Sequence, residues 1–199
     1  MNYEEAKQKV LNSIWKIDVC HVGEECWCRS IRPAEDIKYT RKSNGELDNV
    51  EFVIHEASID EKTAKYIVEL HNNFIEKKPS ISFENFKKIN HAHNNYDEAQ
   101  QYSLNILWKL EFCNVGEKCW CRLILPTQKI EYVHKYSSGN ETVCELDCIV
   151  PDGAIDKDLA EYIVNLHNER LNKLCTCPVL DDHKVTGSSC KIHGLPFCE

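Results

Sequence analysis

Two stretches of the chain carry three cysteines, a tryptophan and an arginine at the same spacing, Cys-x5-Cys-Trp-Cys-Arg. The cysteines are Cys20, Cys26 and Cys28 in the first stretch and Cys113, Cys119 and Cys121 in the second. Thiolates are preferred ligands of zinc, whose structural sites normally have four ligands. Free cysteine also fills a core well as a small apolar residue. We favour the core role, because zinc motifs usually carry close cysteine pairs in turns rather than alternating along a strand, and we keep zinc as the alternative.

The tryptophan and arginine of each stretch point to a second chemistry. Trp27 alternates with Arg29, and Trp120 with Arg122, so on a strand each pair lies on one face. An aromatic ring can stack on a base and a guanidinium can hold a phosphate, which together would form a nucleotide pocket. The alternative is a core tryptophan beside a surface arginine. The sequence alone favours that alternative, because tryptophan is mostly buried.

Two histidines and two tyrosines complete the candidate ligand-binding set. His71 and His167 fall on the apolar face of the helix expected to close each stretch. A buried neutral histidine needs a hydrogen-bond partner, and we favour this role over a general base because no nucleophile or carboxylate pair accompanies either residue. Tyr39 and Tyr132 are the other polar candidates, one in each stretch.

Residues 175–199 contain a third set of metal-ligating residues. Cys-x-Cys at Cys175 and Cys177 is followed by Cys-x2-His at Cys190 and His193. Two close ligand pairs across a loop are what a small zinc knuckle requires, and metal would supply the folding energy that so small a segment lacks. We therefore expect a structural zinc site here, with a disordered cysteine-rich tail as the alternative.

The Cys-Trp-Cys-Arg stretches belong to a longer sequence repeat. Trp15 returns as Trp108, an offset of 93 residues, and residues 64–72 return as residues 160–168. A unit of about 75 to 80 residues is near the lower limit for a self-sufficient core. We therefore expect two copies of one unit to pack on each other with pseudo-twofold symmetry.

Hydrophobic periodicity predicts the elements of each unit. The fold class is α+β, a tandem duplication of a helix, an antiparallel sheet and a second helix. In the first unit we expect a helix over 3–12, strands over 14–19, 26–32, 37–42 and 50–55, a hairpin turn at Asn44-Gly45, and a helix starting near Ser58 or Asp60. The predicted boundaries are 1–78 for the first unit, 79–94 for a linker, 95–174 for the second unit and 175–199 for the tail.

Composition and charge limit the classes of partner. Hydrophobic residues make up 42% of the chain and charged residues 28%, with a net charge of −8 and no apolar run long enough for a membrane span. We expect a cytoplasmic protein with no membrane and no duplex nucleic acid as partner, because duplex binding relies on lysine and arginine. A small anionic ligand held by local arginines stays open, as does the oligomeric state. Twelve cysteines without an export signal indicate thiols or metal ligands.

The closing pattern Ala-x-Tyr-Ile-Val-x-Leu-His-Asn, behind tryptophan-led strands, resembles small uncharacterised proteins of bacteriophages. The resemblance spans residues 14–76 and 107–173 in outline. It implies a phage origin and a place in the host cytoplasm. Many such proteins act by binding, among them inhibitors of host defence and sponges for nucleotide signals. Our first hypothesis is a non-enzymatic sponge with two equivalent sites, the second an inhibitor of a host defence protein, and the third a zinc-dependent enzyme.

Overall fold

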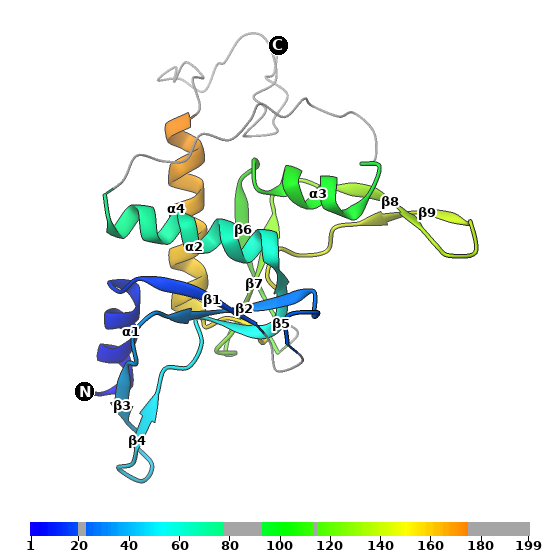
Figure 1. The fold of residues 1–199 in the computed structure, drawn as a ribbon. Coiled ribbons are helices and arrows are strands. Elements are labelled where there is room, and N and C mark those ends of the chain that lie inside the picture. The colour runs from blue at the N-terminus through cyan, green and yellow to red at the C-terminus, as the bar shows by residue number, and fades with distance from the viewer. Residues whose placement is uncertain (20–22, 78–92, 114, 175–199) are drawn as a thin grey trace.

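The computed structural model describes residues 1–19, 23–77, 93–113 and 115–174, which form helices and small antiparallel sheets (Figure 1). The chain is therefore α+β, as its sequence predicts. Within these residues, no helix is both long and apolar enough to cross a membrane.

The described part of the first half contains two helices and five strands. Their bounds are α1 (Tyr3–Leu11), β1 (Trp15–Val19), β2 (Cys28–Pro33), β3 (Lys38–Thr40), β4 (Leu47–Asn49), β5 (Ile54–Asp60) and α2 (Glu61–Ile75). Strand β2 lies between β1 and β5 in one antiparallel sheet, and β3 pairs with β4 in a separate hairpin. This hairpin extends away from the sheet at the bottom of Figure 1.

The second half runs in a similar order. Its elements are α3 (Tyr96–Ser103), β6 (Trp108–Phe112), β7 (Arg122–Pro126), β8 (Glu131–Lys135), β9 (Glu141–Glu145) and α4 (Lys157–Leu174). Strand β6 pairs with β7, and β8 with β9. Isolated bridges from Cys121 to Asp156 and from Ile124 to Val150 place the segment before α4 alongside β7. This segment therefore takes the position beside β7 that β5 takes beside β2.

Capping side chains fix where α1 and α2 begin, and Asp60 is the cap that the sequence predicts. The side chain of Asn2 accepts a hydrogen bond from the backbone N–H of Glu5, and the carboxylate of Glu5 accepts one from the N–H of Asn2, which completes a capping box. Asp60 caps α2 in the same way, by accepting hydrogen bonds from the first free N–H groups of the helix. Helix α4 begins directly after Asp156, the residue that the repeat aligns with Asp60.

The strand prediction for residues 50–55 is wrong. A single strand was expected over 50–55, but β4 ends at Asn49 and β5 begins at Ile54. The chain changes partners between them, because the N–H of Val53 donates to the carbonyl of Ile31 at 2.7 Å and starts the pairing with β2. The hairpin turn at Asn44-Gly45 is confirmed, and Gly45 has a φ of 73°, which glycine tolerates best.

In each half, a buried tryptophan on the first strand is hydrogen-bonded both to the helix before it and to the closing helix, α2 or α4. The indole N–H groups of Trp15 and Trp108 donate to carbonyls at the ends of the preceding helices, at 2.9 and 2.8 Å. The amide side chain of Asn72 in α2 both accepts from the N–H and donates to the carbonyl of Trp15, each at 2.9 Å. Asn168 in α4 makes the same two bonds to Trp108, also at 2.9 Å.

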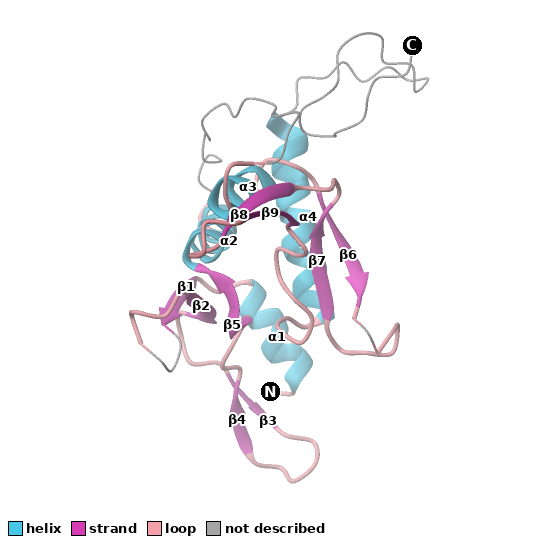
Figure 2. Cartoon of the chain, turned by 90° about the vertical axis from the view of Figure 1, so that its right-hand side faces the viewer, coloured by secondary structure: helices cyan, strands magenta, loops and turns pink. Residues whose placement is uncertain are grey.

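Two histidine–tyrosine pairs join α2 to α4, which cross one another in Figure 1 and lie next to each other in Figure 2. The Nδ1 atom of His71 lies 2.9 Å from the hydroxyl of Tyr162, and that of His167 lies 2.6 Å from the hydroxyl of Tyr66. Each Nε2 lies 2.7 or 2.8 Å from a backbone carbonyl, which can only accept. Both rings therefore carry their proton on Nε2 and accept from tyrosine at Nδ1.

The first helix of each half contacts the start of the last helix of the other. Lys7 in α1 donates to Asp156 at 3.2 Å, and Gln100 in α3 donates to Asp60. The sequence repeat aligns Lys7 with Gln100, and Asp60 with Asp156. The halves thus pack on one another through matching positions. Their origin as two copies related by pseudo-twofold symmetry stays a prediction from the sequence.

Candidate metal centre

Three cysteine side chains of the second half converge where the β6–β7 hairpin turns. The Sγ atoms of Cys113, Cys119 and Cys121 all lie within 4.8 Å of one another, and those of Cys119 and Cys121 are 3.3 Å apart. Cys113 and Cys121 are buried, and Cys119 is half-buried. Among the described residues, no other three histidine, cysteine or acidic side chains meet in this way.

The thiols meet because the chain turns where the sequence predicts a strand. Strand β7 begins only at Arg122. Before it, the N–H of Gly116 donates to the carbonyl of Cys113 at 2.8 Å, and the N–H of Cys119 donates to that of Gly116 at 3.1 Å. Alternate residues of an extended strand are about 6.6 Å apart, so strand geometry would hold these sulfurs well apart. The strand prediction for this stretch, and for its counterpart over 26–32, is therefore wrong in its first residues.

Arg122 holds this turn in place. Its guanidinium donates to the carbonyls of Cys119 at 2.9 Å, of Cys121 at 2.7 Å and of Glu117 at 3.3 Å. It also lies over the ring of Phe112, with 4.7 Å between guanidinium carbon and ring centroid. The side chain is buried. Arg122, predicted as a phosphate ligand, here organises the backbone around the thiols.

The thiols differ in their acidity. The pKa of Cys119 is lowered by a hydrogen bond from the backbone N–H of Cys121 and by the neighbouring thiols. Burial raises the pKa of Cys121 to about 11. A cation bound among the three sulfurs would stabilise all the thiolates, so metal binding would release protons.

The arrangement fits a tetrahedral zinc ion. A zinc–sulfur distance of about 2.3 Å places two sulfur ligands about 3.8 Å apart, close to the separations found here. A disulfide needs about 2.05 Å, and these cysteines are free thiols. The core role favoured from sequence accounts for the burial of Cys113 and Cys121. The core role does not explain why the three sulfur atoms lie so close together, and this proximity suits the binding of a soft metal ion.

The first half repeats part of this geometry. The Sγ atoms of Cys26 and Cys28 are 3.2 Å apart. The guanidinium of Arg29 donates to the carbonyl of Cys28 at 2.9 Å, to that of Cys26, and to the carboxylate of Glu61 at 2.8 Å. Arg29 therefore also organises a cysteine turn. Cys20, the remaining cysteine of the motif, lies outside the described residues.

Trp27 and Trp120 are exposed, so the core role favoured for them from sequence is wrong. Their side chains are 65% and 55% exposed, whereas Trp15 and Trp108 occupy the core. The tryptophan rings of the cysteine turns thus face solvent while the arginines beside them are largely buried. This is the reverse of the expected core tryptophan and surface arginine.

The other predicted ligand-binding residues lie elsewhere in the fold. The hydroxyl of Tyr39 in β3 donates to Asp48 at 2.8 Å, and the ring of Tyr132 in β8 packs against Tyr96. His71 and His167 are fully buried between α2 and α4, in agreement with the hydrogen-bonded core role favoured from sequence. The predicted zinc ligands that lie outside the described residues are Cys175, Cys177, Cys190 and His193.

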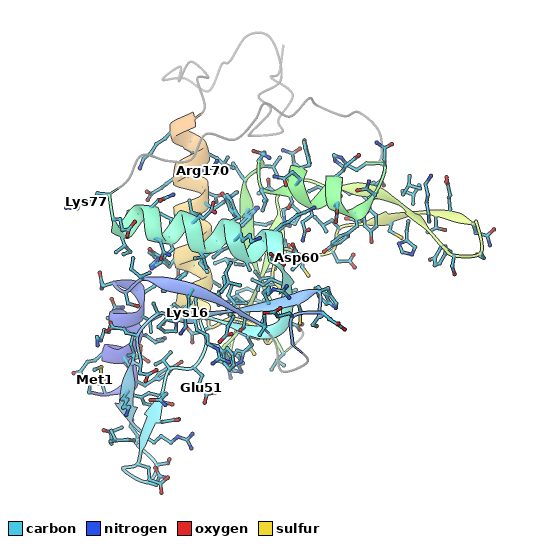
Figure 3. The ribbon with its side chains drawn as sticks, in the orientation of Figure 1. Met1, Lys16, Glu51, Asp60, Lys77 and Arg170 are labelled. Atoms are coloured by element: carbon cyan, nitrogen blue, oxygen red, sulfur yellow. The ribbon has the colours of Figure 1, made fainter. Side chains whose placement is uncertain are left out.

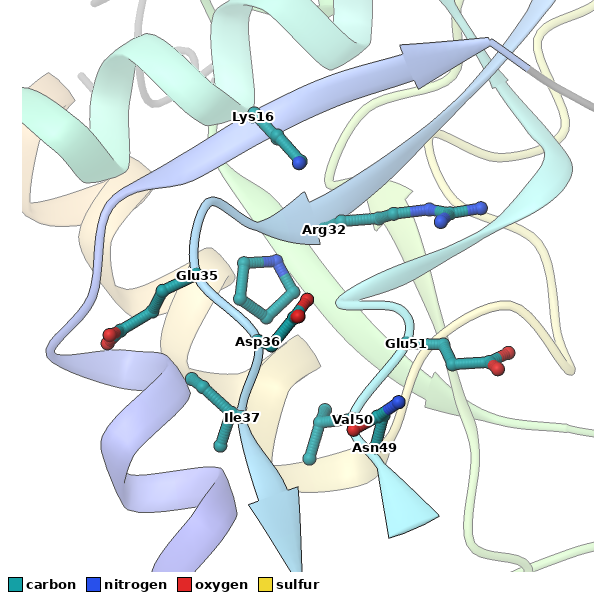
Figure 4. Close-up of a pocket in the computed structure, with 9 residues that line it drawn as sticks. Lys16, Arg32, Glu35, Asp36, Ile37, Asn49, Val50 and Glu51 are labelled. Carbon is teal, nitrogen blue, oxygen red and sulfur yellow. The ribbon is translucent and has the colours of Figure 1, made fainter.

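A small cavity of 240 Å³ lies beside β1, β2 and the β3–β4 hairpin (Figure 4). Lys16 and Asp36 point toward it, whereas Glu35 and Glu51 point away. Arg32, which also lines it, pairs with Asp18 on β1 at 3.3 Å. Its walls carry charges of both signs, so this cavity does not favour an anionic ligand.

Comparisons with protein families, with curated proteins and with solved structures found no match. The resemblance to bacteriophage proteins therefore stays a prediction from the sequence.

Proposed function

We propose that the chain is a zinc-binding protein and that Cys113, Cys119 and Cys121 hold the ion. The observation that supports this is the convergence of their three sulfur atoms within 4.8 Å of one another. Thiolates favour soft or borderline metal ions, and zinc has no redox chemistry that would oxidise its own ligands. Water can supply the fourth ligand that a tetrahedral zinc ion needs.

The position of the centre suits a structural role. Cys121 bridges to Asp156, the residue before α4. The N–H of Lys157, the first residue of α4, donates to the carbonyl of Trp120 at 2.8 Å. An ion bound by the three thiols would therefore tie the β6–β7 turn to the start of α4, the helix that packs on α2.

The turn also displays a tryptophan, which suits a non-enzymatic binding protein. Trp120 stands between two proposed ligands, and its ring is exposed. Nucleotide capture by Arg29 and Arg122 is less well supported, because both guanidinium groups donate to carbonyls of their own turns. The sponge, the inhibition of a host defence protein and the phage origin remain predictions from the sequence.

Zinc content tests the proposal. The full-length protein, purified under reducing conditions, is expected to contain zinc by elemental mass spectrometry. The double substitution Cys113→Ser and Cys121→Ser should remove one equivalent of it. The control replaces two cysteines outside the cluster, Cys144→Ser and Cys148→Ser, and should leave the zinc content unchanged.

Cobalt gives an independent readout, because sulfur-to-cobalt charge-transfer absorption reports thiolate ligands directly. The wild-type protein should show this band more strongly than the Cys113→Ser, Cys121→Ser variant. Equal zinc content and equal cobalt absorption in the two proteins would refute the proposed centre.

Replacing the arginine that organises the turn should weaken metal binding. Arg122→Gln removes the donors to the carbonyls of Glu117, Cys119 and Cys121 while leaving all three thiols. Residues that orient metal ligands typically contribute about 10- to 100-fold to affinity, so we expect a loss in that range in a competition titration with a zinc chelator. Arg41→Gln on the exposed β3–β4 hairpin is the control and should bind zinc like the wild type. An unchanged affinity in Arg122→Gln would contradict the role assigned to this side chain.

A further inference from the structure

The cysteine turn of the first half, residues 23–28, follows the same backbone path as residues 116–121 of the second half. The N–H of Cys26 donates to the carbonyl of Gly23 at 3.2 Å. In the second half, the N–H of Cys119 donates to the carbonyl of Gly116 at 3.1 Å. Gly23 has a φ of 100° and Gly116 a φ of 88°, both in the left-handed region that favours glycine. The two turns therefore bend the chain in the same way before the strand that follows each of them.

The two turns also bring their thiols together alike. The Sγ atoms of Cys26 and Cys28 are 3.2 Å apart, and those of Cys119 and Cys121 are 3.3 Å apart. Cys28 is buried and Cys26 half-buried, as are Cys121 and Cys119 in the same order. Both separations are close to the roughly 3.8 Å between two sulfur ligands of one tetrahedral zinc ion. The first-half turn thus presents the same pair of sulfur ligands.

A largely buried arginine supports each pair of thiols. The guanidinium of Arg29 donates to the carbonyls of Cys26 and Cys28, as that of Arg122 does for the second-half pair. Arg29 also donates to the carboxylate of Glu61, the first residue of α2, at 2.8 Å. In both halves the arginine therefore fixes the backbone that carries the two thiols.

Each turn lies against the residue that precedes the closing helix of its half. Cys28 pairs with Asp60 in the β2–β5 ladder, and Cys121 bridges to Asp156. Asp60, which is labelled in Figure 3, caps α2, and Asp156 directly precedes α4. A metal ion at either turn would therefore occupy the same place in the fold.

We propose that Cys26 and Cys28 hold a second zinc ion, so that the chain binds one ion at the start of each closing helix. This inference rests on the function proposed above, because the matching turn of the second half supplies the reason to expect metal here. The repeat aligns Cys113 with Cys20, which lies outside the described residues, so the second centre is assigned to Cys26 and Cys28 alone. The other ligand positions of a tetrahedral ion are open to water or to further side chains.

The two ions would act on the helices that join the halves. Helix α2 is joined to α4 by the pairs of His71 with Tyr162 and of Tyr66 with His167. An ion at Cys26 and Cys28 would tie the β1–β2 turn to the start of α2. The two centres would thus anchor both partners of the helix pair, each to the strands of its own half.

Native mass spectrometry of the full-length protein tests the inference by counting the zinc ions that each chain carries. The variant Cys26→Ser, Cys28→Ser should carry one ion fewer than the wild type. Adding Cys113→Ser and Cys121→Ser should remove one ion more. If the Cys26→Ser, Cys28→Ser variant keeps the wild-type number of ions, the second centre is refuted.

The same measurement separates this inference from the proposed function. Loss of an ion only in the Cys113→Ser, Cys121→Ser variant refutes the first-half centre and leaves the second-half centre standing. Loss of an ion only in the Cys26→Ser, Cys28→Ser variant supports the first-half centre and refutes the second-half one.

The matched control replaces two cysteines outside both turns, Cys144→Ser and Cys148→Ser, and should keep the wild-type number of ions.

Two milder variants keep the test valid if replacing the buried Cys28 unfolds the protein. Cys26→Ser changes only a half-buried thiol, and Arg29→Gln leaves both thiols in place. In competition with a zinc chelator, each should weaken the binding of one ion by at least about tenfold, the lower end of the range for residues that orient ligands, and leave the other ion unaffected. Arg41→Gln on the exposed β3–β4 hairpin should bind both ions like the wild type. Wild-type affinity for both ions in Cys26→Ser and in Arg29→Gln would overturn the assignment.

Discussion

The free energy of unfolding is expected to fall as the pH drops below about 6.5, and His71 and His167 should each contribute up to about 1.4 kcal/mol per pH unit to that slope. Burial lowers the pKa of His71 to about 4 and that of His167 to about 3. In the unfolded chain both rings would titrate near 6.5. Between these values the unfolded state binds protons that the folded state does not. Stability is therefore full above pH 6.5 and is lost progressively down to pH 4 for His71 and pH 3 for His167.

The hydrogen bonds explain why the folded protein keeps these rings neutral. In each ring Nε2 donates to a carbonyl, so Nδ1 must accept from a tyrosine hydroxyl. The hydroxyl of Tyr66 also accepts from the guanidinium of Arg170 at 3.0 Å, which directs its own proton toward His167. Protonation of His167 would place a second donor against this hydroxyl and a second cation near Arg170. His167 therefore resists protonation more strongly than His71.

Urea unfolding at pH 7, 6 and 5, followed by circular dichroism, measures the effect. His167→Gln removes one titrating group and should flatten the pH dependence, even though it lowers stability at pH 7. His134→Gln on the exposed β8–β9 hairpin is the control and should preserve the wild-type slope. If His167→Gln and wild type lose stability in parallel from pH 7 to pH 5, the buried histidine is not the source.

The elements that local chemistry specifies were predictable from the sequence. The start of α2 followed from Asp60, because its side chain satisfies N–H groups that nothing else in the helix can satisfy. The turn at Asn44-Gly45 followed from the need for a left-handed residue. The burial of His71 followed from helical periodicity, since the apolar face of α2 must pack against the core.

The cysteine turn was not predictable from alternation alone. Placing Cys119 and Cys121 on a strand assumes an extended backbone, and the hydrogen bonds of Gly116 and Arg122 bend it instead. The available signal was a glycine and an arginine on either side of the cysteines in both halves. Hydrophobicity likewise placed Trp120 in the core, although its ring is exposed on that bend.

The second large effect is expected at Asn168, where replacement by aspartate should lower the free energy of unfolding by about 3 kcal/mol at neutral pH. The amide of Asn168 accepts from the N–H of Trp108 and donates to its carbonyl, both at 2.9 Å. Aspartate keeps the acceptor but turns the donor into a second carboxylate oxygen that faces the carbonyl. The variant loses a hydrogen bond and gains a repulsion at the point where α4 holds β6.

Asn165→Asp makes the same chemical change on the exposed face of α4 and is the matched control. Its effect should stay within about 0.5 kcal/mol, as for other surface substitutions, in the same urea titrations. A comparable loss of unfolding free energy in the two variants would mean that the added charge on the helix, rather than the contact with Trp108, causes the destabilisation. A large difference would show that α4 is held to the second-half strands through one amide side chain. Asn72 makes the same two bonds to Trp15. Asn72→Asp should then lower the free energy of unfolding to a similar extent, at the contact of α2 with β1.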